Sequence, residues 1–171
     1  MENQFQNNEV INFPDISKIT FKSIEKRYLK VALLSAFSYI LVIVPGIVFF
    51  LEKVIRKKEE DFPFYLVYIS LTVLVIFYIL NIVLSFPKRK YVIRDQDITY
   101  KSGLITRKMV TVPFSRIQHV EIDEGMFSRF FKLASLSVYT AGDSSDDLEI
   151  KGLSKEQALQ IKEFISGKIN E

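Results

Sequence analysis

Two long uncharged apolar runs constrain this chain of 171 residues more than any other feature. They cover Val31 to Leu51 and Phe62 to Phe86, and the ten residues from Glu52 to Asp61 separate them. At about 1.5 Å of helical rise per residue, the two runs extend roughly 31 and 37 Å, whereas the hydrocarbon core of a bilayer is about 30 Å thick. Burying both as core helices of a soluble protein would need more chain than the roughly 115 residues left over. The sequence therefore predicts a transmembrane helical hairpin.

The hairpin divides the chain into five expected segments. These are a cytoplasmic tail with an amphipathic segment (1–30), a first transmembrane helix (31–51), a short extracytoplasmic connector (52–61), a second transmembrane helix (62–86) and a cytoplasmic domain (87–171). In the tail, Phe21, Ile24 and Tyr28 recur at helical spacing with basic residues between them. This pattern predicts a helix that lies at the membrane interface or packs on the soluble domain as a lead-in to the first span. Because thirty residues precede the first run, we expect it to be retained and not cleaved as a signal peptide.

Basic residues at the ends of the spans predict the orientation, because Lys and Arg are retained on the cytoplasmic side. Eight lie outside the hairpin and four lie in the connector, where four acidic residues balance them. The eight are Lys22, Lys26, Arg27, Lys30, Lys88, Arg89, Lys90 and Arg94, and the four are Lys53, Arg56, Lys57 and Lys58. We therefore expect a multi-pass protein with both termini in the cytoplasm.

Composition argues against several classes of function. The chain has no cysteine, which excludes disulfides, thiol catalysis and cysteine-ligated metals. The net charge of +3 lacks the concentrated basic face of a nucleic-acid binder. Neither apolar run contains an ionisable side chain of the kind that lines an ion or proton pathway. With no catalytic pair or phosphate loop visible, we expect no enzyme activity, no cofactor and no small-molecule substrate.

The residues after Pro87 are typical of short antiparallel strands. Alternation or extended apolar character marks Tyr91 to Ile93, Ile98 to Lys101, Leu104 to Val112, Val120 to Asp123, Leu136 to Val138 and Leu148 to Ile150. Ser154 and Gln157 then have the spacing of a capping box, which predicts the start of a C-terminal amphipathic helix. The fold class is α+β: a transmembrane hairpin, then a curved antiparallel sheet or barrel of about seven strands with a C-terminal helix.

Three ordered segments of this domain resemble the type 2 bacterial pleckstrin-homology (PH) domain of the YdbS-like membrane proteins. They are Thr111 to Val120, Gly125 to Ala134 and Val138 to Gly142. The resemblance covers the chain from about Phe13. It implies a PH-like barrel on the cytoplasmic face of a bacterial inner membrane and a non-catalytic module, with some relatives connected to envelope stress. It supplies no ligand.

The motif residues are expected to be mainly structural. They are Pro113, Arg116, Ile117, Gln118, Gly125, Phe127, Arg129, Phe130, Leu133, Thr140, Ala141 and Gly142. The spacing of Phe127, Phe130 and Phe131 favours a helical turn that plugs the barrel, and membrane contact is the alternative. The family has a glycine where this chain has Lys132, which places the local turn geometry in question.

A metal site is not expected. Asp143 to Asp147 contains three carboxylates, but it lacks the glycine and the terminal glutamate of a calcium loop. A polar hairpin tip explains this run. His119 is the sole histidine, which excludes a multi-histidine site.

Two functional hypotheses remain, and both have the lipid bilayer as a partner. The first is a membrane-anchored binding or scaffold module that recruits a protein partner or forms a homo-oligomer. The second is a sensor of anionic lipid headgroups that uses a juxtamembrane basic patch. The candidate contact residues are Lys88, Arg89, Lys90, Arg107 and Lys108. The first three also serve as the positive flank of the second span, which is a sufficient reason for their presence.

Overall fold

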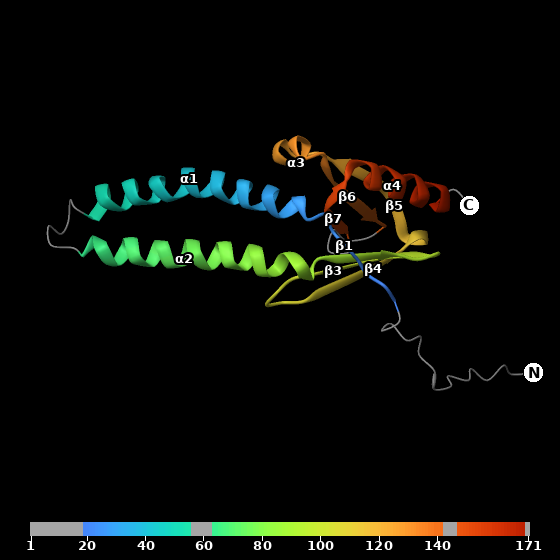
Figure 1. Ribbon diagram of the computed structural model, residues 1–171, viewed down its shortest axis with the longest axis horizontal. Coiled ribbons are helices and arrows are strands. Elements are labelled where there is room, and N and C mark those ends of the chain that lie inside the picture. Colours follow the sequence, from blue (N-terminus) through green and yellow to red (C-terminus); the bar gives the residue numbers. More distant parts are fainter. Residues whose placement is uncertain (1–18, 56–62, 142–146, 170–171) are drawn as a thin grey trace, which may run out of the picture.

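A long helical hairpin extends from one end of a β-rich domain (Figure 1). The computed structural model describes residues 19–55, 63–141 and 147–169. Helices α1 (Arg27–Ile55) and α2 (Phe64–Ser85) form the hairpin, and both are long and apolar enough to cross a membrane. Near its far end, the hydroxyl of Tyr68 donates a hydrogen bond to the carboxylate of Glu52 and so links the two helices. Large apolar side chains remain exposed along both helices, as expected where lipid is the solvent.

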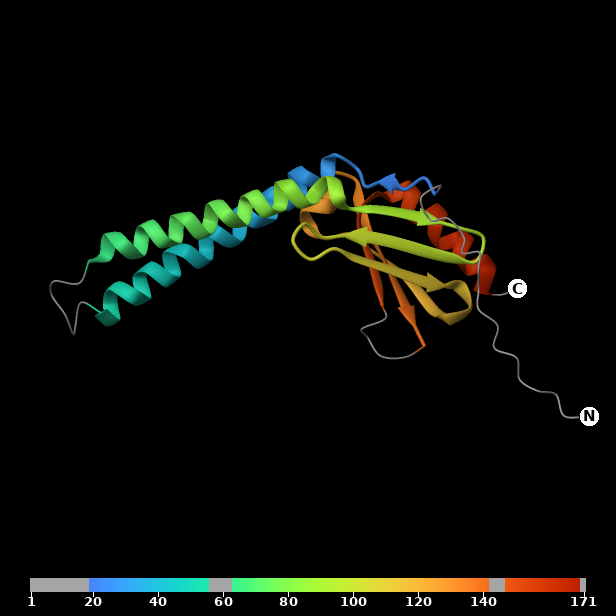
Figure 2. The same ribbon diagram turned by 90° about the horizontal axis from the view of Figure 1, so that it is seen from below.

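Two antiparallel sheets and a C-terminal helix form the domain. The first sheet has the order β1 (Lys22–Ser23), β2 (Lys90–Ile93), β3 (Asp97–Ser102) and β4 (Lys108–Pro113), and the second has the order β5 (Ile117–Asp123), β6 (Leu133–Thr140) and β7 (Leu148–Ser154). The shorter elements are η2 (Phe86–Lys88), η3 (Phe114–Arg116) and α3 (Met126–Phe130), and α4 (Lys155–Ile169) closes the chain. Figure 2 shows the strands of one sheet running across those of the other.

The core lies between the two sheets and is closed by α4. Ile98 from the first sheet and Leu136 and Ile150 from the second are fully buried. Helix α4 packs against all three strands of the second sheet and buries Ile161 and Ile165 there. This arrangement confirms the expected curved sheet with a C-terminal helix, because the alternating residues of each strand direct one apolar face inward.

The predicted capping box at the start of α4 is confirmed. The backbone N–H of Gln157 donates to the Ser154 Oγ at 3.2 Å, and the backbone N–H of Ser154 donates to the Gln157 Oε1 at 3.3 Å. Two backbone donors that the helix leaves unpaired are thereby satisfied.

One strand of the domain comes from before the hairpin. Lys22 pairs with Tyr91 and Ser23 pairs with Lys90, so β1 is the edge neighbour of β2. Ile24, the next residue, is only 4% exposed and belongs to the core. The described tail residues before Arg27 are therefore not the expected amphipathic helix, because strand pairing and the burial of Ile24 favour an extended backbone. The hairpin is inserted between β1 and β2, and the domain is not confined to residues 87–171.

A second difference concerns the stretch expected to be a strand from Leu104 to Val112. Only the part from Lys108 pairs with β3, and the residues before it form a turn. Gly103 begins this turn with φ of +96°, and a Cβ there would lie 1.9 Å from the carbonyl oxygen of Thr106. The turn therefore requires glycine at this position.

Candidate binding cleft at the membrane boundary

The start of α1 is fixed to the domain through Gly152 of β7. The backbone N–H of Glu25 donates to the Gly152 carbonyl at 2.9 Å. Gly152 has φ of +81°, and a Cβ added to it would lie 2.5 Å from the Cγ of Tyr28 in the first turn of α1. Glycine is thus needed both for the backbone conformation and for the close approach of the helix.

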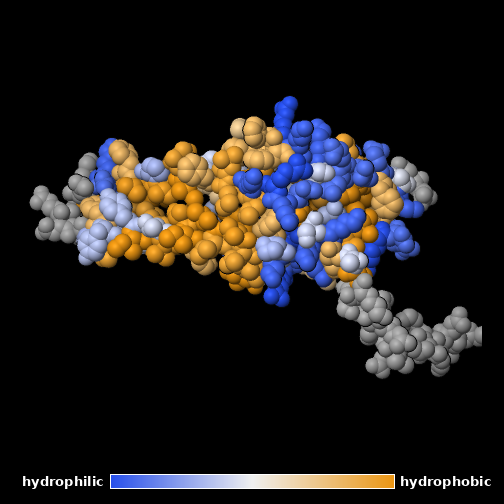
Figure 3. Space-filling model, viewed as in Figure 1, coloured by the Kyte–Doolittle hydropathy of each residue, from blue (hydrophilic) through white to orange (hydrophobic). Residues whose placement is uncertain are grey.

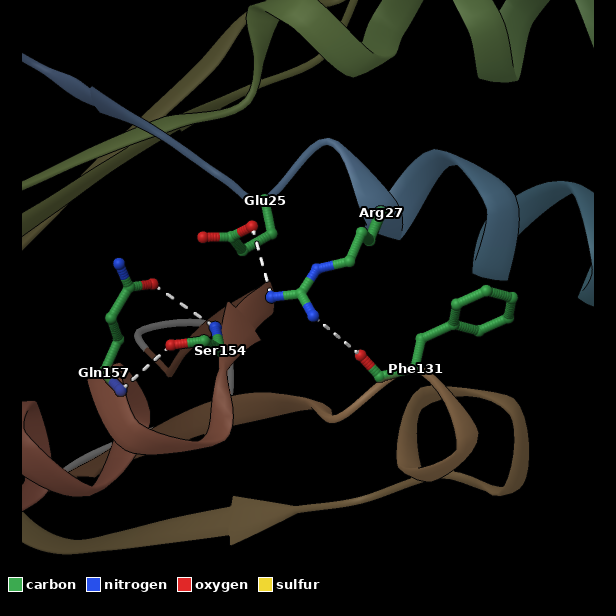
Figure 4. Close-up of polar contacts among 5 residues, drawn as sticks. All are labelled: Glu25, Arg27, Phe131, Ser154 and Gln157. Carbon is green, nitrogen blue, oxygen red and sulfur yellow. Dashed lines mark hydrogen bonds and ion pairs between the residues drawn. The ribbon is translucent and has the colours of Figure 1, made fainter.

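Arg27 adds polar contacts on the same side (Figure 4). Its Nη1 donates to the carbonyl of Phe131, just after α3, at 3.4 Å, and its Nη2 lies 3.5 Å from the Glu25 carboxylate. Figure 4 also shows the capping box of Ser154 and Gln157 beside this junction. The first helix of the hairpin therefore starts from a surface made by β7 and α3.

The second helix of the hairpin leads directly into β2 through η2. Arg89 follows η2, and its guanidinium lies 5.7 Å from the ring centroid of Tyr28. Tyr100 is buried, and its hydroxyl lies within range of the Arg89 charge. Burial raises the pKa of the Tyr100 hydroxyl, while the charge of Arg89 acts in the opposite direction. Arg89 therefore connects both ends of the hairpin to the first sheet and is not a free basic residue.

A basic cleft of about 720 Å³ lies between η2 and the turn that joins β3 to β4. Five cationic side chains line it, and no described lining residue carries a carboxylate. They are Lys88, Lys90, Lys101, Arg107 and Lys108. Phe21 and Met109 contribute apolar walls, and the Lys101 ammonium lies 3.7 Å from the ring centroid of Phe21. We call this site the basic cleft.

The basic cleft lies where the membrane hairpin meets the domain. Its wall includes Pro87 and Lys88 of η2, which continues α2 without a break. Figure 3 shows apolar surface covering the hairpin and hydrophilic surface beginning at the domain. The basic cleft is therefore adjacent to the end of the second apolar helix.

Four of the five predicted contact residues meet in the basic cleft, and Arg89 does not. Lys101 was not among the predicted contact residues, and it occupies a register position opposite Lys90 on one side and Met109 on the other. The alternation of Lys101 with apolar neighbours predicted a strand. Only the pairing of β2, β3 and β4 places Lys101 beside the other basic residues of the cleft. Gly152 was not predicted either, because its role depends on contact with Tyr28, which is distant in the sequence.

The family-motif residues are distributed over the second half of the domain. Pro113 ends β4, Arg116 lies in η3, and Ile117 and Gln118 begin β5. Gly125 caps α3, Phe127 and Arg129 lie within α3, and Leu133 begins β6 and is fully buried. The Ala141 N–H donates to the Arg116 carbonyl at 2.9 Å, which joins the first and third motif segments next to Thr140. Gly142 lies outside the described residues.

The expected barrel plug at the aromatic segment is wrong. Helix α3 has no buried residue, and its Met126 and Phe130 are 83% and 82% exposed. The core is already closed by α4, so α3 lies outside it and contacts both β6 and the start of α1. Lys132, which follows α3, has φ of 55°, the left-handed conformation in which the family's glycine is favoured. The departure at Lys132 thus leaves the turn intact at some cost in backbone strain.

Other polar clusters offer no metal site within residues 19–55, 63–141 and 147–169. No group of three or more His, Asp or Glu residues there is placed to hold a metal ion. His119 is exposed on β5 and stacks on Tyr139 with ring centroids 4.4 Å apart, and the negative charge of Glu121 raises the pKa of Tyr139. Most of the Asp143 to Asp147 run lies outside the described residues, and the carboxylate of Asp147 accepts a hydrogen bond from the Thr140 N–H.

These features define a membrane-anchored PH-like domain with a basic cleft at the membrane boundary. The sequence matches the Bacterial PH domain family over residues 27–169, and the chain belongs to that family. The match begins at the first residue of α1 and ends at the last residue of α4.

Two curated relatives come from Bacillus subtilis strain 168, and both are described as UPF0699 transmembrane proteins. YdbT is 28% identical over an alignment of 122 residues that covers 63% of this chain and 25% of YdbT. YdbS is 29% identical over 77 residues, which are 45% of this chain and 46% of YdbS. The matched region thus spans a quarter to about half the length of these relatives. A crystal structure of a DUF1696 family protein with a pleckstrin-homology domain from Shewanella loihica is also similar, with a TM-score of 0.37, 20% identity and coverage of 47% of this chain and 70% of that one.

Proposed function

We propose that this chain is a non-catalytic binding module of a bacterial inner membrane, and that its basic cleft binds the anionic headgroup of a phospholipid in the cytoplasmic leaflet. The observation that carries the proposal is the convergence of five cationic side chains beside the end of α2. We assign both termini and the domain to the cytoplasm, because eight basic residues flank the hairpin on their side and only four lie in the connector.

The chemistry of the basic cleft suits a phosphate ester. Arg107 can bind phosphate oxygens with two parallel N–H groups, and the lysines act as flexible point charges around it. A volume of about 720 Å³ is within the range of ligand sites. A basic side chain close to an anionic leaflet contributes about 1 kcal/mol of binding free energy. Because several such side chains converge in one concave site, they favour the binding of a specific anionic headgroup. Basic residues that only set the orientation of a span would not need to converge.

The test is a titration of the full-length protein in non-ionic detergent with a short-chain phosphatidylglycerol, followed by calorimetry. Replacing Arg107 and Lys108 with alanine removes two charges and is expected to weaken binding by about 2 kcal/mol, or roughly 30-fold. The double variant Lys151→Ala and Lys162→Ala removes two charges outside the cleft and is expected to bind as the wild type does. Equal affinity for a short-chain phosphatidylcholine, or equal loss in both double variants, would contradict the proposal.

A second candidate function is the recruitment of a protein partner or self-assembly, and β4 favours it. In the sheet order β4 is an edge strand, so its outer backbone groups face a groove of about 290 Å³ lined by Arg116 and Thr140. The hydroxyl of Thr140 is buried without a hydrogen-bond partner. An extended segment of another chain could pair with β4 as an added strand.

Crosslinking in intact membranes tests this second candidate. A photoreactive residue at the exposed position Thr111 of β4 is expected to capture a discrete adduct, whereas one at Glu163 of α4 is not. A ladder of multiples of this chain indicates self-assembly, and a single adduct of another mass indicates a partner. Identical background labelling at both positions would remove the scaffold function.

A further inference from the structure

Helix α3 presents an apolar tip beside the first turn of α1. Met126 and Phe130 are the most exposed large apolar side chains of the described residues, at 83% and 82%. Scattered apolar side chains are normal on protein surfaces, so exposure alone does not indicate a binding surface. The position of α3 is more informative, because Arg27 at the start of a membrane span hydrogen-bonds to the carbonyl of Phe131. The apolar tip therefore lies next to the place where the chain enters the bilayer.

The turn between β3 and β4 presents a second apolar tip on the other side of the hairpin. Ile105 in this turn is 75% exposed. The turn borders the basic cleft opposite Pro87, at the end of the second span. Figure 1 shows α3 beside the start of α1 and this turn below the end of α2, both directed along the hairpin and away from the rest of the domain.

Charged residues around the two tips fit a lipid surface. Arg129 and Lys132 accompany Phe130, and Arg107 and Lys108 follow Ile105. Apolar side chains with basic neighbours are typical of segments that lie in the interface of an anionic membrane. The nearest acidic residue before α3, Glu124, pairs with Lys155 at 2.7 Å and so is neutralised.

We infer that the domain rests on the leaflet through these two tips, with Phe130 and Met126 entering the lipid on one side of the hairpin and Ile105 on the other. The occupant of both surfaces is the interfacial lipid that surrounds the hairpin. Three attachments, the hairpin and the two tips, then set the tilt of the domain and hold the opening of the basic cleft at the headgroups. The inference concerns apolar insertion and does not depend on headgroup binding in the cleft.

The natural chain contains no tryptophan, so a single introduced tryptophan reports its own environment. The test uses the full-length Phe130→Trp and Ile105→Trp variants in phosphatidylcholine vesicles, in which part of the lipid carries bromine on the acyl chains. The matched control is Phe164→Trp, because Phe164 is a partly exposed aromatic residue of α4, 43% exposed, in the half of the helix remote from the hairpin. Met126→Trp is the second variant of α3 in case the first one does not fold.

If the tips insert as deeply as the apolar face of an interfacial helix, bromine should quench the tryptophan fluorescence of the tip variants at least roughly twofold. The fluorescence of Phe164→Trp should not change. The quenching of the tip variants should persist when Lys90 and Lys101, which line the basic cleft but belong to neither tip, are replaced with alanine, and this separates insertion from headgroup binding. Equal emission with and without bromine at both tips would overturn the inference. A blue-shifted but unquenched signal would also overturn it, because it would show that protein and not lipid covers the tips.

Discussion

Replacing Gly152 with alanine is expected to lower the free energy of unfolding of the domain by about 2 to 4 kcal/mol, from the strain of a positive φ and the overlap with a neighbouring side chain. The backbone at Gly152 has φ of +81°, and the new Cβ would lie 2.5 Å from the Cγ and 2.7 Å from the Cβ of Tyr28. The first turn of α1 must then move away from β7. Thermal unfolding of the detergent-solubilised protein, followed by circular dichroism, measures the loss.

Gly167 provides the matched control. It lies in α4 with nothing within 4 Å of its added Cβ, so Gly167→Ala is expected to stabilise the chain by up to about 1 kcal/mol. Combining Gly152→Ala with Tyr28→Ala should recover part of the loss, because the ring atoms of Tyr28 are then absent while its Cβ remains. Similar unfolding temperatures for the two single glycine variants would show that Tyr28 does not pack on Gly152.

A fragment that starts at residue 87 is expected to be about 3 to 5 kcal/mol less stable than a chain in which residues 19–26 are joined to residue 87 by a short flexible linker. The fragment lacks β1 and leaves a cavity where Ile24 would be buried. A short linker suffices because Ser23 and Lys90 are paired neighbours in the sheet. Since small domains have only about 5 to 15 kcal/mol of stability, the fragment should be largely unfolded or aggregated.

Two substitutions in the joined chain locate the cause. Ile24→Ala is expected to cost about 2 to 4 kcal/mol, whereas Lys22→Ala at an exposed position is expected to change stability by less than about 0.5 kcal/mol. Denaturant unfolding of the fragment, the joined chain and its two variants gives these values directly. If the fragment and the joined chain unfold at the same denaturant concentration, the segment before the hairpin is not part of the domain.

Local patterns explain what could be predicted from the sequence. The apolar runs predicted the hairpin, alternation predicted most of the strands after Pro87, and Ser154 with Gln157 predicted the start of α4, because each signal lies within a few residues of the element it describes. Strand β1 has only two residues, and its partner lies beyond the entire hairpin. Its neighbours Phe21, Ile24 and Tyr28 also happen to have helical spacing, so the local pattern indicated the wrong conformation.

The candidate site divides in the same way. The charged flank after α2 and the basic pair Arg107 and Lys108 are visible in the sequence, but their convergence with Lys101 depends on the register of three strands. Arg89 lies between two lysines of the cleft in the sequence, but its side chain is directed toward Tyr28 and Tyr100 and does not line the cleft. The aromatic spacing of α3 correctly predicted a helical turn, but spacing cannot tell whether the core has room for it.

The most direct test of the central claim, that the basic cleft binds an anionic phospholipid, is native mass spectrometry of the protein gently extracted from bacterial membranes. We expect the wild-type chain to carry an anionic phospholipid. The Arg107→Ala and Lys108→Ala double variant should lose this lipid, and the Lys151→Ala and Lys162→Ala double variant should retain it. The same retained lipid on all three proteins, or only zwitterionic lipid on the wild type, would contradict the claim.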